Sequence, residues 1–577
     1  MNMQVSDIIC NILENYGVKR AYGMIGYGID ILMQSLAKTN IRVVNVLNEE
    51  CAGFAAGSDS FFSDKPSVCL GSTGPGVIHF LNGLYDAHRN NTPVLFIACQ
   101  VKQKYIGLNT GNEVDIKRVF SECSHYCDYI YSEDQILQKL ELALQTSIIK
   151  RGVSVVIIPQ DMMEKVIEVA SIPKASYISK PIVYPSDAEL RAIAKEINNA
   201  KKVVLYGGIG CRFANKEVMD FARKIKACVG WAYRGKPYLD HDNPYPIGMN
   251  GLLGDKSCVE AFHNCDLLIL LGTGFAFTNF YPEHCKIIQI DIDGGNINRR
   301  HWVNIGVVGD IKESLKQLDS LVEEKQDDSF ANKYRKSHDD VIKHLTKIAT
   351  ENKESDSEIL PEHLSSEINC RIAKDALVVA DIGSPWAYMA KYIDSLGSRD
   401  FYNSNHHGTM ANALSSAIGM QIANPGRQVI AMCGDGGFTM LAGDIQTIVK
   451  EKLPIKIFVF NNKRLDFVAL EMKVSGLIDS ATDLKETNFA KLAEAVGVKG
   501  YRVERNGELK NAIIQALLFN GPVIVDVSIN PNSLLMPPDI NTDMMTHFSK
   551  YLIEAFMSGE KKTVFEMFKT NFPRQIP

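Results

Sequence analysis

The feature that most constrains this sequence is a pair of short polar motifs, each placed directly after an apolar run. Residues 429–433 are all apolar, which is typical of a strand buried in a parallel sheet, and they end at Gly434-Asp435-Gly436. A helical pattern over residues 438–449 follows, and a second apolar run, residues 455–460, ends at Asn461-Asn462. This strand–helix–strand order predicts a parallel α/β sheet with the acid and the amide side by side at its carboxyl edge.

The residue types in this unit suit a magnesium-bound diphosphate. Gly434, Gly436 and Gly437 would let the backbone approach a phosphate closely, and the start of the helix supplies unpaired N–H groups. Asp435 and Asn462 offer hard oxygen ligands, which Mg²⁺ prefers. Gly-Asp-Gly alone also fits a turn that closes an ordinary strand, but Asn-Asn at the end of the next strand favours the metal site.

The same alternation of strands and helices continues along the chain. Its 577 residues are too many for one core, and a proline-rich passage (172–186) and a polar passage (350–362) divide them. We predict an α/β fold of three doubly wound parallel-sheet domains, residues 1–175, 183–348 and 360–530, followed by a short amphipathic helical segment, residues 531–577. Strands are expected at residues 21–26, 42–47, 67–71, 94–99, 153–159, 203–207, 267–272, 287–290, 377–380, 429–433, 455–460 and 523–527.

Composition narrows the class of protein. The chain is 46% hydrophobic and 22% charged with a net charge of −5, and no basic cluster points to a nucleic-acid partner. Its 13 cysteines lack metal-ligand spacing, as in a reduced cytosolic protein. The N-terminal residues lack the basic segment that is typical of a signal peptide. No apolar run reaches the roughly 20 residues that are needed to span a membrane.

Several motifs resemble one enzyme superfamily. Cys433-Gly-Asp-Gly-Gly-Phe-Thr-Met-Leu441 with Phe460-Asn-Asn462 is similar to the thiamine diphosphate (ThDP) motif of the 2-keto acid decarboxylase superfamily. The likeness is closest to the bacterial ubiquinone-dependent pyruvate dehydrogenases (pyruvate oxidases), and it extends to residues 120–127, 151–156 and 569–571. It covers nearly the whole chain. The resemblance implies that the first domain binds the ThDP pyrimidine, the second FAD, and the third the diphosphate with Mg²⁺.

In the first domain the candidate catalytic residue is Glu49, which precedes a helix of small residues. ThDP loses its C2 proton to its own aminopyrimidine when a carboxylate hydrogen-bonds the pyrimidine ring, and a dry pocket strengthens that bond. The register of the family favours Glu49 over Glu50. The alternative is that the helix dipole simply favours an acidic residue in the first turn of the helix, and this explanation fits Glu50 better. In the family the glutamate comes from a neighbouring subunit, so the resemblance implies a homo-oligomer, usually a tetramer.

The second domain carries the FAD prediction. Its candidate loops follow expected strands or open helices, where glycines admit a pyrophosphate and an aspartate accepts from a ribose hydroxyl. By resemblance the FAD-binding residues are Asn250, Gly251, Leu252, Leu253, Thr273, Gly274, Phe275, Ala276, Phe277 and Asp291. A Rossmann-like spacer without cofactor explains the same residues. FAD also occurs in the related acetolactate synthases, so it does not settle the reaction.

The third domain adds further candidates by resemblance. Gly408, Thr409 and Met410 precede an Ala/Ser-rich helix, and Met410 falls where the family has a bulky apolar residue under the bent cofactor. A core methionine is the alternative for Met410. Arg464 occupies the position whose carbonyl joins Asp435 and Asn462 as a metal ligand, and Phe467 is the candidate wall of the substrate pocket.

The final segment distinguishes between the related enzymes, because a carboligase such as acetolactate synthase should lack a lipid-binding tail. Residues 543–572 place apolar side chains three or four apart among lysines, which suits a pair of short helices lying in a lipid headgroup layer. A helix packed on the protein's own core is the alternative. The resemblance favours membrane docking, and it implies a cytoplasmic enzyme that binds the cytoplasmic face of the cell membrane and passes electrons to ubiquinone.

The predicted reaction is therefore oxidative decarboxylation of pyruvate to acetate and CO₂. Several positions depart from the family. Gly111-Asn112 stands where the family has Phe-Gln, Tyr27 where it has an acidic residue, and Asn48 where it has a histidine. In the third domain, Asp466 replaces a glycine and Arg464 replaces a small apolar residue. A larger or more polar 2-keto acid is an open alternative. Two further alternatives are open: an acetolactate synthase-like carboligase and a non-catalytic membrane-associated scaffold.

Overall fold

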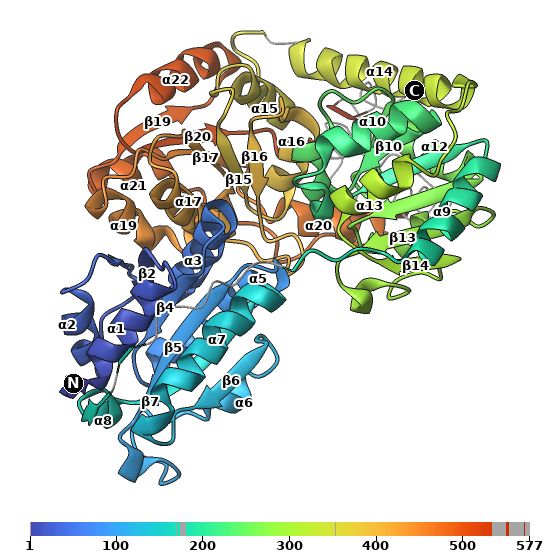
Figure 1. The fold of residues 1–577 in the computed structure, drawn as a ribbon. Coiled ribbons are helices and arrows are strands. Elements are labelled where there is room, and N and C mark those ends of the chain that lie inside the picture. Colours follow the sequence, from blue (N-terminus) through green and yellow to red (C-terminus); the bar gives the residue numbers. More distant parts are fainter. Residues whose placement is uncertain are drawn as a thin grey trace.

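The computed structural model describes residues 2–169, 171–172, 181–351, 354–533, 550–552 and 570–571. Within them, three six-stranded parallel sheets with flanking helices form three domains (Figure 1). The predicted α/β fold class is confirmed. Most of the predicted tail, residues 531–577, lies outside the described residues.

The first domain has a sheet of strand order β3-β2-β4-β5-β7-β6. Its strands are β2 (Arg20–Gly23), β3 (Arg42–Asn45), β4 (Ser67–Gly71), β5 (Val94–Gln100), β6 (Tyr126–Tyr129) and β7 (Val153–Pro159). Its helices are α1 (Val5–Asn15), α2 (Asp30–Leu36), α3 (Glu49–Ser63), α4 (Pro75–Ile78), α5 (Leu81–Arg89), α6 (Ile116–Phe120), α7 (Ile136–Lys150) and α8 (Gln160–Met163). A small antiparallel pair, β1 (Asn2–Gln4) with β8 (Val166–Glu168), joins the two ends of the domain.

The second domain has the strand order β11-β10-β9-β12-β13-β14. Its strands are β9 (Val203–Gly207), β10 (Cys228–Trp231), β11 (Pro246–Met249), β12 (Leu267–Leu271), β13 (Lys286–Asp291) and β14 (Ile305–Val308). Its helices are α9 (Asp187–Asn199), α10 (Asn215–Ile225), α11 (Lys236–Leu239), α12 (Lys256–Asn264), α13 (Ile311–Asp319) and α14 (Ser329–Thr350). In chain order this arrangement reads 3-2-1-4-5-6, the order of dinucleotide-binding sheets.

The third domain has the strand order β16-β15-β17-β18-β20-β19. Its strands are β15 (Leu377–Ala380), β16 (Asp400–Tyr402), β17 (Val429–Gly434), β18 (Lys456–Asn461), β19 (Lys499–Val503) and β20 (Val523–Ser528). Its helices are α15 (Pro361–Asn369), α16 (Ser384–Tyr392), α17 (Asn412–Ala423), α18 (Asp435–Met440), α19 (Ile445–Lys450), α20 (Asp466–Val474), α21 (Phe489–Ala495) and α22 (Asn506–Leu518). Numbered along its own domain, this sheet reads 2-1-3-4-6-5, and so does the first.

Every predicted strand exists, with ends that shift by up to three residues. Several short or edge strands, among them β6, β10, β16 and β19, were not predicted because their apolar runs are brief. The expected continuous helix over residues 438–449 is wrong. The chain becomes helical at Asp435, and a 3₁₀ turn at Ala442–Asp444 separates α18 from α19.

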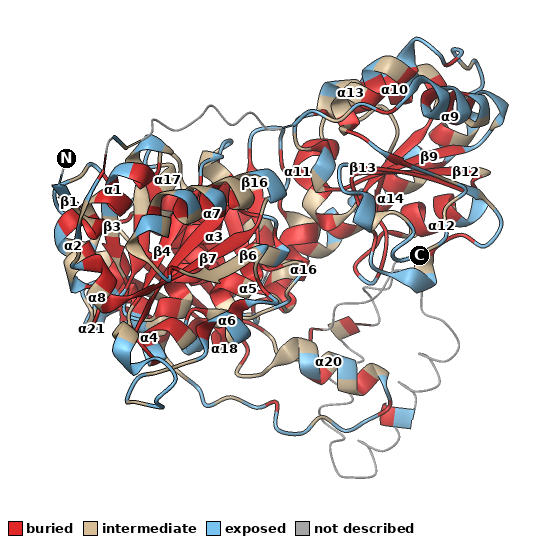
Figure 2. Cartoon of the chain, turned by 60° about the horizontal axis from the view of Figure 1, so that its bottom comes forward, coloured by how far each residue is buried: buried red, intermediate tan, exposed pale blue. Residues whose placement is uncertain are grey.

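The domains share their hydrophobic cores. One face of the third sheet forms a continuous core with the first domain, and the other face forms one with the second domain. Figure 2 shows the buried residues concentrated on the strands and on the inward faces of the helices. The third domain therefore lies between the other two and packs against both.

Helices α3 and α17 form the contact between the first and third domains. Ser58 Oγ donates to the carbonyl of Ser416 at 2.8 Å. A Cβ atom on Gly419 would come within 2.0 Å of the Ala55 carbonyl oxygen, so the two helix backbones touch. Both helices are rich in small residues and buried nearly all round, which explains their low amphipathicity.

Candidate active site

A cavity opens at the carboxyl edge of the third sheet, between β15 and β17. The chain order of the sheet reverses between these two neighbouring strands, and such switch points are where open α/β sheets bind ligands. The cavity is lined by Asp381, Ile382, Gly383, Ser384, Pro385, Met410, Gly434, Asp435, Gly436, Gly437, Phe460, Asn462, Arg464, Leu465, Asp466, Phe467, Val468 and Ile529. Most of these residues lie at or after the carboxyl ends of β15, β17 and β18 or on α20, while Met410 follows β16 and Ile529 follows β20. All of them belong to the third domain.

Asp435 holds a buried carboxyl group in the cavity wall. Its Oδ1 accepts from its neighbour's backbone N–H, that of Gly436, at 2.8 Å, and its Oδ2 accepts from the N–H of Lys463 at 2.6 Å. Burial raises the pKa of Asp435 to about 6 despite these hydrogen bonds. A divalent cation at this carboxylate would oppose that shift, as expected for a metal ligand.

Asn462 and Arg464 lie on the opposite side of the same turn. Asn462 is buried, and its Oδ1 accepts from the backbone N–H of Arg464 at 3.1 Å. The Arg464 guanidinium points to Asp479 and Asp483, at 3.6 and 3.4 Å. The side chain that departs from the family is therefore engaged in ion pairs and leaves the backbone of Arg464 at the cavity.

The cavity fits a diphosphate with its metal. A Cβ on Gly434 would approach nothing closer than Pro385 at 3.8 Å, and one on Gly383 would meet only Phe467 at 4.0 Å, so space is open above both backbones. Asp381 Oδ2 is buried without a hydrogen-bond partner, and burial raises the pKa of this carboxyl to about 7. In the described part of the chain no three His, Cys, Asp or Glu side chains cluster to hold a metal by themselves, so the diphosphate would have to complete the coordination.

Apolar side chains close the rest of the cavity. Met410 and Phe467, both predicted from the sequence, lie in its wall with Phe460 and Leu465. A Cβ on Gly436 would be 3.1 Å from Met410 Cε, so the methionine reaches across to the glycine motif. Gly408, with φ +79°, and Thr409 lie just outside the lining, directly before Met410. The structure thus brings the 408–410 segment to the Asp435 site.

Glu49 is the first residue of α3, which follows the edge strand β3 of the first domain. It is 5% exposed, and its Oε2 lies 3.0 Å from His79 Nδ1. The loop after β4 passes beside it, since a Cβ on Gly76 would be 3.1 Å from Glu49 Oε1. Glu49 does not line the Asp435 cavity. Its predicted contribution from a second subunit stays a prediction.

Contacts of the neighbouring residues nevertheless link the start of α3 to the third domain. Asn82 Nδ2 donates to Glu50 Oε1 at 2.6 Å and lies 3.1 Å from Thr409 Oγ1. Asp444, which the sequence analysis did not single out, accepts from the backbone N–H groups of Leu47 at 2.8 Å and Asn48 at 3.2 Å. Asp444 therefore fixes the segment that leads into Glu49, and only the tertiary structure could reveal it.

The predicted FAD residues gather at one edge of the second sheet. They follow β11, β12 and β13, and the loops touch, since a Cβ on Gly251 would come within 2.4 Å of the Phe277 ring. Gly274 has no atom within 4 Å of an added Cβ, and Leu252 and Phe277 are each more than a third exposed. This open apolar edge fits a planar cofactor. Asp291 Oδ1 already accepts from the backbone N–H of Asp293 at 3.0 Å and from Asn296 at 3.2 Å.

Two departures from the family lie at the first domain's edge. Asn112, with φ +66°, packs against Gly74 in the loop beside Glu49. Tyr27 is 66% exposed, and its hydroxyl accepts from Gln160 Nε2 at 3.1 Å. Asn112 thus places a polar side chain in the loop beside the predicted catalytic glutamate, and Tyr27, at a position where the family has an acid, is bound by Gln160.

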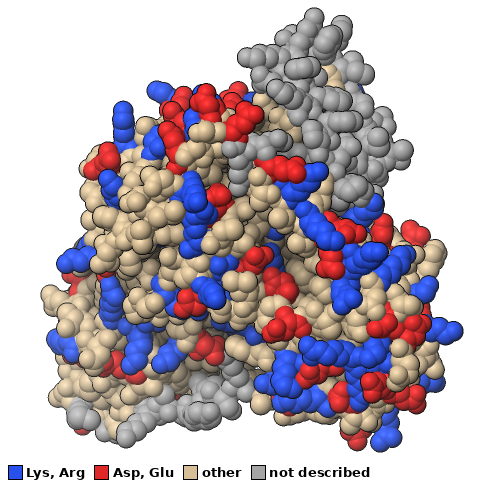
Figure 3. All heavy atoms as spheres, turned by 90° about the horizontal axis from the view of Figure 1, so that it is seen from above, with Lys and Arg blue, Asp and Glu red and all other residues tan. Residues whose placement is uncertain are grey.

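Little of the C-terminal segment is described. Tyr551 is fully buried, and its ring lies 5.6 Å from Lys473 Nζ at the end of α20. One apolar residue of the predicted membrane-binding segment thus packs on the protein itself. None of the helices described here is both long and apolar enough to cross a bilayer. Acidic and basic side chains are interspersed over the face shown in Figure 3.

The fold and the site together define a thiamine-dependent enzyme. Three family models of thiamine pyrophosphate enzymes match: the N-terminal TPP-binding domain over residues 3–120, the central domain over 190–318, and the C-terminal TPP-binding domain over 381–527. With a relative 32% identical over almost its full length, this shows that the chain belongs to the thiamine pyrophosphate enzyme family.

Its relatives include proteins with different reactions. The 32% identity is to YdaP of Bacillus subtilis, named only as a thiamine pyrophosphate-containing protein, and covers 96% of both chains. A pyruvate oxidase of Lactiplantibacillus plantarum is 25% identical over 96% of this chain and 93% of its own. The large subunit of acetolactate synthase isozyme 2 of Escherichia coli is 26% identical over 94% and 99%. The predicted superfamily is confirmed, and the particular reaction is left open.

Proposed function

We propose that this protein oxidatively decarboxylates pyruvate or a related 2-keto acid and passes the electrons through FAD to a membrane ubiquinone. The observation that carries the proposal is the glycine-lined cavity at the β15/β17 switch point, with Asp435 and Asn462 at its base. The second sheet, with dinucleotide-binding strand order and an open apolar edge, supports a flavin. The similarity to a pyruvate oxidase over nearly the whole chain agrees with both.

The residues of this chain would divide the work. Asp435, Asn462 and the Arg464 carbonyl would hold Mg²⁺, the backbone at Gly434 and Gly436 would face the diphosphate, and Met410 would support the cofactor from below. Glu49 would hold a proton at the pyrimidine nitrogen. Bound ThDP would supply the electron sink that lets CO₂ leave. Pyruvate and water then yield acetate, CO₂, two protons and two electrons, and a quinone takes up both.

A direct test is an anaerobic titration of the flavin-loaded protein with pyruvate and other 2-keto acids. We expect loss of the visible flavin absorbance together with release of CO₂, both dependent on ThDP and Mg²⁺. A Glu49→Gln variant should lose both signals, because the amide cannot hold the pyrimidine proton in the same way. Bound flavin that stays oxidised with every 2-keto acid would contradict the oxidative reaction.

A separate experiment tests the proposed quinone reduction and membrane binding. A chain ending at residue 542 should retain CO₂ release with a soluble dye but lose any stimulation by lipid vesicles, because residues 543–572 carry the predicted lipid-binding pattern. Vesicles that leave both binding and quinone reduction of the full chain unchanged would contradict the membrane assignment.

A carboligase of the acetolactate synthase type is the second candidate. Acetolactate synthases match the chain over a similar length and at similar identity, for example 28% over 93% of the chain. Product analysis separates the two, since a carboligase forms a carbon–carbon bond between two 2-keto acids with no net transfer of electrons to an acceptor.

A further inference from the structure

Two helices begin opposite each other in the wall of the cavity. Asp466 is the first residue of α20, and Ser384 is the first residue of α16. Ser384 Oγ donates to Asp466 Oδ2 at 2.5 Å, and both residues line the cavity. The pair lies beside Phe467, the predicted substrate wall, so the carboxyl group of Asp466 is next to an apolar part of the cavity lining.

The other acids of the cavity are bound by the backbone, and Asp466 is not. Asp435 accepts from two backbone N–H groups and Asp381 from that of Ala413 at 2.9 Å. Among the described residues Ser384 is the only hydrogen-bond donor to the Asp466 side chain, which leaves acceptor capacity on this carboxyl.

The two nearby cations, Lys473 and Arg464, form their ion pairs with other acids. Lys473 pairs with Asp479 at 2.9 Å, and its side chain is 3% exposed. Arg464 turns toward Asp479 and Asp483. In the described ranges no ion pair includes Asp466, so this acid lacks the cationic partner that would make its role purely structural.

We propose that Asp466, oriented by Ser384, selects 2-keto acids whose side chain carries a hydrogen-bond donor such as a hydroxyl group. This inference rests on the proposed 2-keto acid chemistry. A methyl group against Asp466 would desolvate an acceptor without pairing it, which is unfavourable. A hydroxyl group would pair with it while its carbon chain packs on Phe467. A site that hydrogen-bonds a substrate hydroxyl discriminates strongly against the analogue that lacks it.

The test compares 2-oxobutanoate with its 4-hydroxy derivative, using CO₂ release by the ThDP- and Mg²⁺-loaded full-length protein. We expect kcat/KM to favour the hydroxylated acid by roughly tenfold or more in the wild type. Asp466→Leu should bring this ratio close to one, both by weakening turnover of the hydroxylated acid and by improving that of 2-oxobutanoate. Asp466→Asn keeps an acceptor oxygen and should retain part of the preference. Asp356→Leu, at a fully exposed side chain, serves as the control and should keep the wild-type ratio.

The outcomes separate this inference from the function on which it rests. A wild-type ratio near or below one overturns the role of Asp466, whether or not the variants fold, while the CO₂ released still supports the 2-keto acid chemistry of the proposed function. A ratio that Asp466→Leu leaves unchanged also overturns it. If no 2-keto acid releases CO₂, the proposed function fails, and this inference fails with it.

Discussion

At the scale of single residues, several buried acids have pKa values that burial raises. Asp381, Asp435 and Asp86 are buried, and burial raises the pKa of each well above that of a free aspartate. Only Asp435 was expected from the sequence, because its glycine neighbours mark it. Asp86 lies in an ordinary helix, and its environment comes from residues that are far away in the chain.

Replacing Asp435 tests the metal site directly. We expect Asp435→Ala to weaken Mg²⁺-dependent binding of ThDP by at least about tenfold, because the site loses its one carboxylate ligand. Isothermal titration of the apo-protein with ThDP at fixed Mg²⁺ would measure this. Asp356→Asn removes a fully exposed acid outside the cavity lining and should leave the affinity unchanged. Equal affinity in the Asp435 variant would refute the assignment.

Asp86 makes the stability depend on pH. Its pKa is raised from 3.8 to about 7 by burial, although Asn90 Nδ2 donates to both of its oxygens. Between about pH 4 and pH 7 the folded protein therefore holds a proton that the unfolded chain has lost, so the stability contributed by the neutral acid falls as the pH rises.

We expect Asp86→Asn to remove this slope, because the amide mimics the neutral acid. Thermal unfolding from pH 5 to pH 8 should show the variant gaining on the wild type as the pH rises, by up to a few kcal/mol. The stability of the exposed control variant, Asp356→Asn, should depend on pH in the same way as that of the wild type. Parallel curves for Asp86→Asn would argue against a buried neutral acid.

At the scale of elements, the contact between α3 and α17 is the most demanding in the fold. The helices approach so closely that no side chain fits at Gly419. The small-residue composition of both helices is evident from the sequence, but their contact with each other is not. Small residues permit a close partner without specifying which one.

Gly419→Ala should destabilise the protein by about 1–3 kcal/mol or more, because the methyl group would overlap the Ala55 carbonyl. Gly426→Ala is the matched control, since an added Cβ there meets nothing within 4 Å. Chemical denaturation of the two variants gives the comparison. A Gly419 variant as stable as the control would show that the helices can separate without cost.

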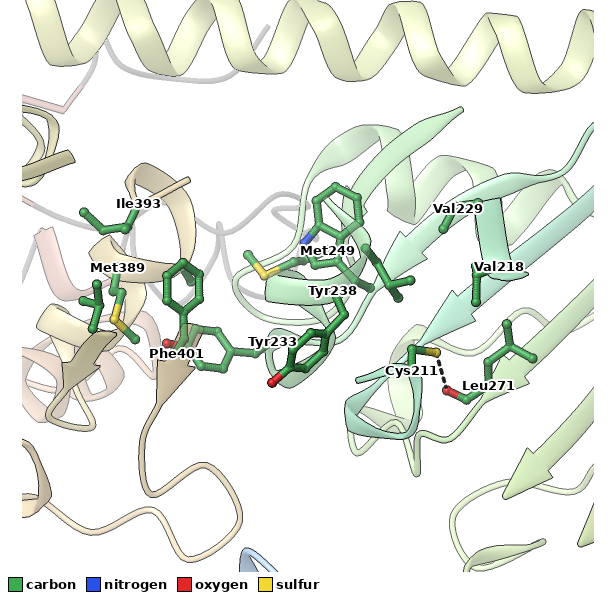
Figure 4. Packing of buried hydrophobic residues seen from close by; sticks show 14 of the residues in the cluster. Cys211, Val218, Val229, Tyr233, Tyr238, Met249, Leu271, Met389, Ile393 and Phe401 are labelled. Carbon is green, nitrogen blue, oxygen red and sulfur yellow. Dashed lines mark hydrogen bonds between the residues drawn. The ribbon is translucent and has the colours of Figure 1, made fainter. Parts of the chain in front are cut away.

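At the scale of the whole molecule, the second domain is joined to the third by buried polar as well as apolar contacts. Lys236 is 6% exposed, and its Nζ donates to the carbonyls of Ala390 and Ile393, at 2.6 and 2.8 Å, where α16 ends. Figure 4 shows Tyr233, Tyr238 and Met249 of the second domain in one cluster with Met389, Ile393 and Phe401 of the third. Because α16 begins in the wall of the candidate cavity, this contact connects the predicted flavin domain to the candidate ThDP site.

Lys236→Met should weaken the contact between the second and third domains, because it leaves two buried carbonyl groups without a hydrogen-bond donor. Each unsatisfied carbonyl should cost about 1–3 kcal/mol of stability. We expect a lower unfolding midpoint and faster proteolytic cleavage between the second and third domains. Lys336→Met, at an exposed position on α14, should behave like the wild type. Unchanged proteolysis of the Lys236 variant would mean that the apolar cluster suffices.

The sequence by itself determined the fold class, the main strands and the acid and amide at the ends of β17 and β18. These follow from local patterns, because a buried strand must be apolar and a sheet edge exposes whatever follows it. Only the tertiary structure decided that the first and third sheets share one strand order, that α3 packs on α17, and that Ser384 meets Asp466. Such contacts join residues tens to hundreds of positions apart. The free energy that selects them comes from packing between elements, which no local pattern records.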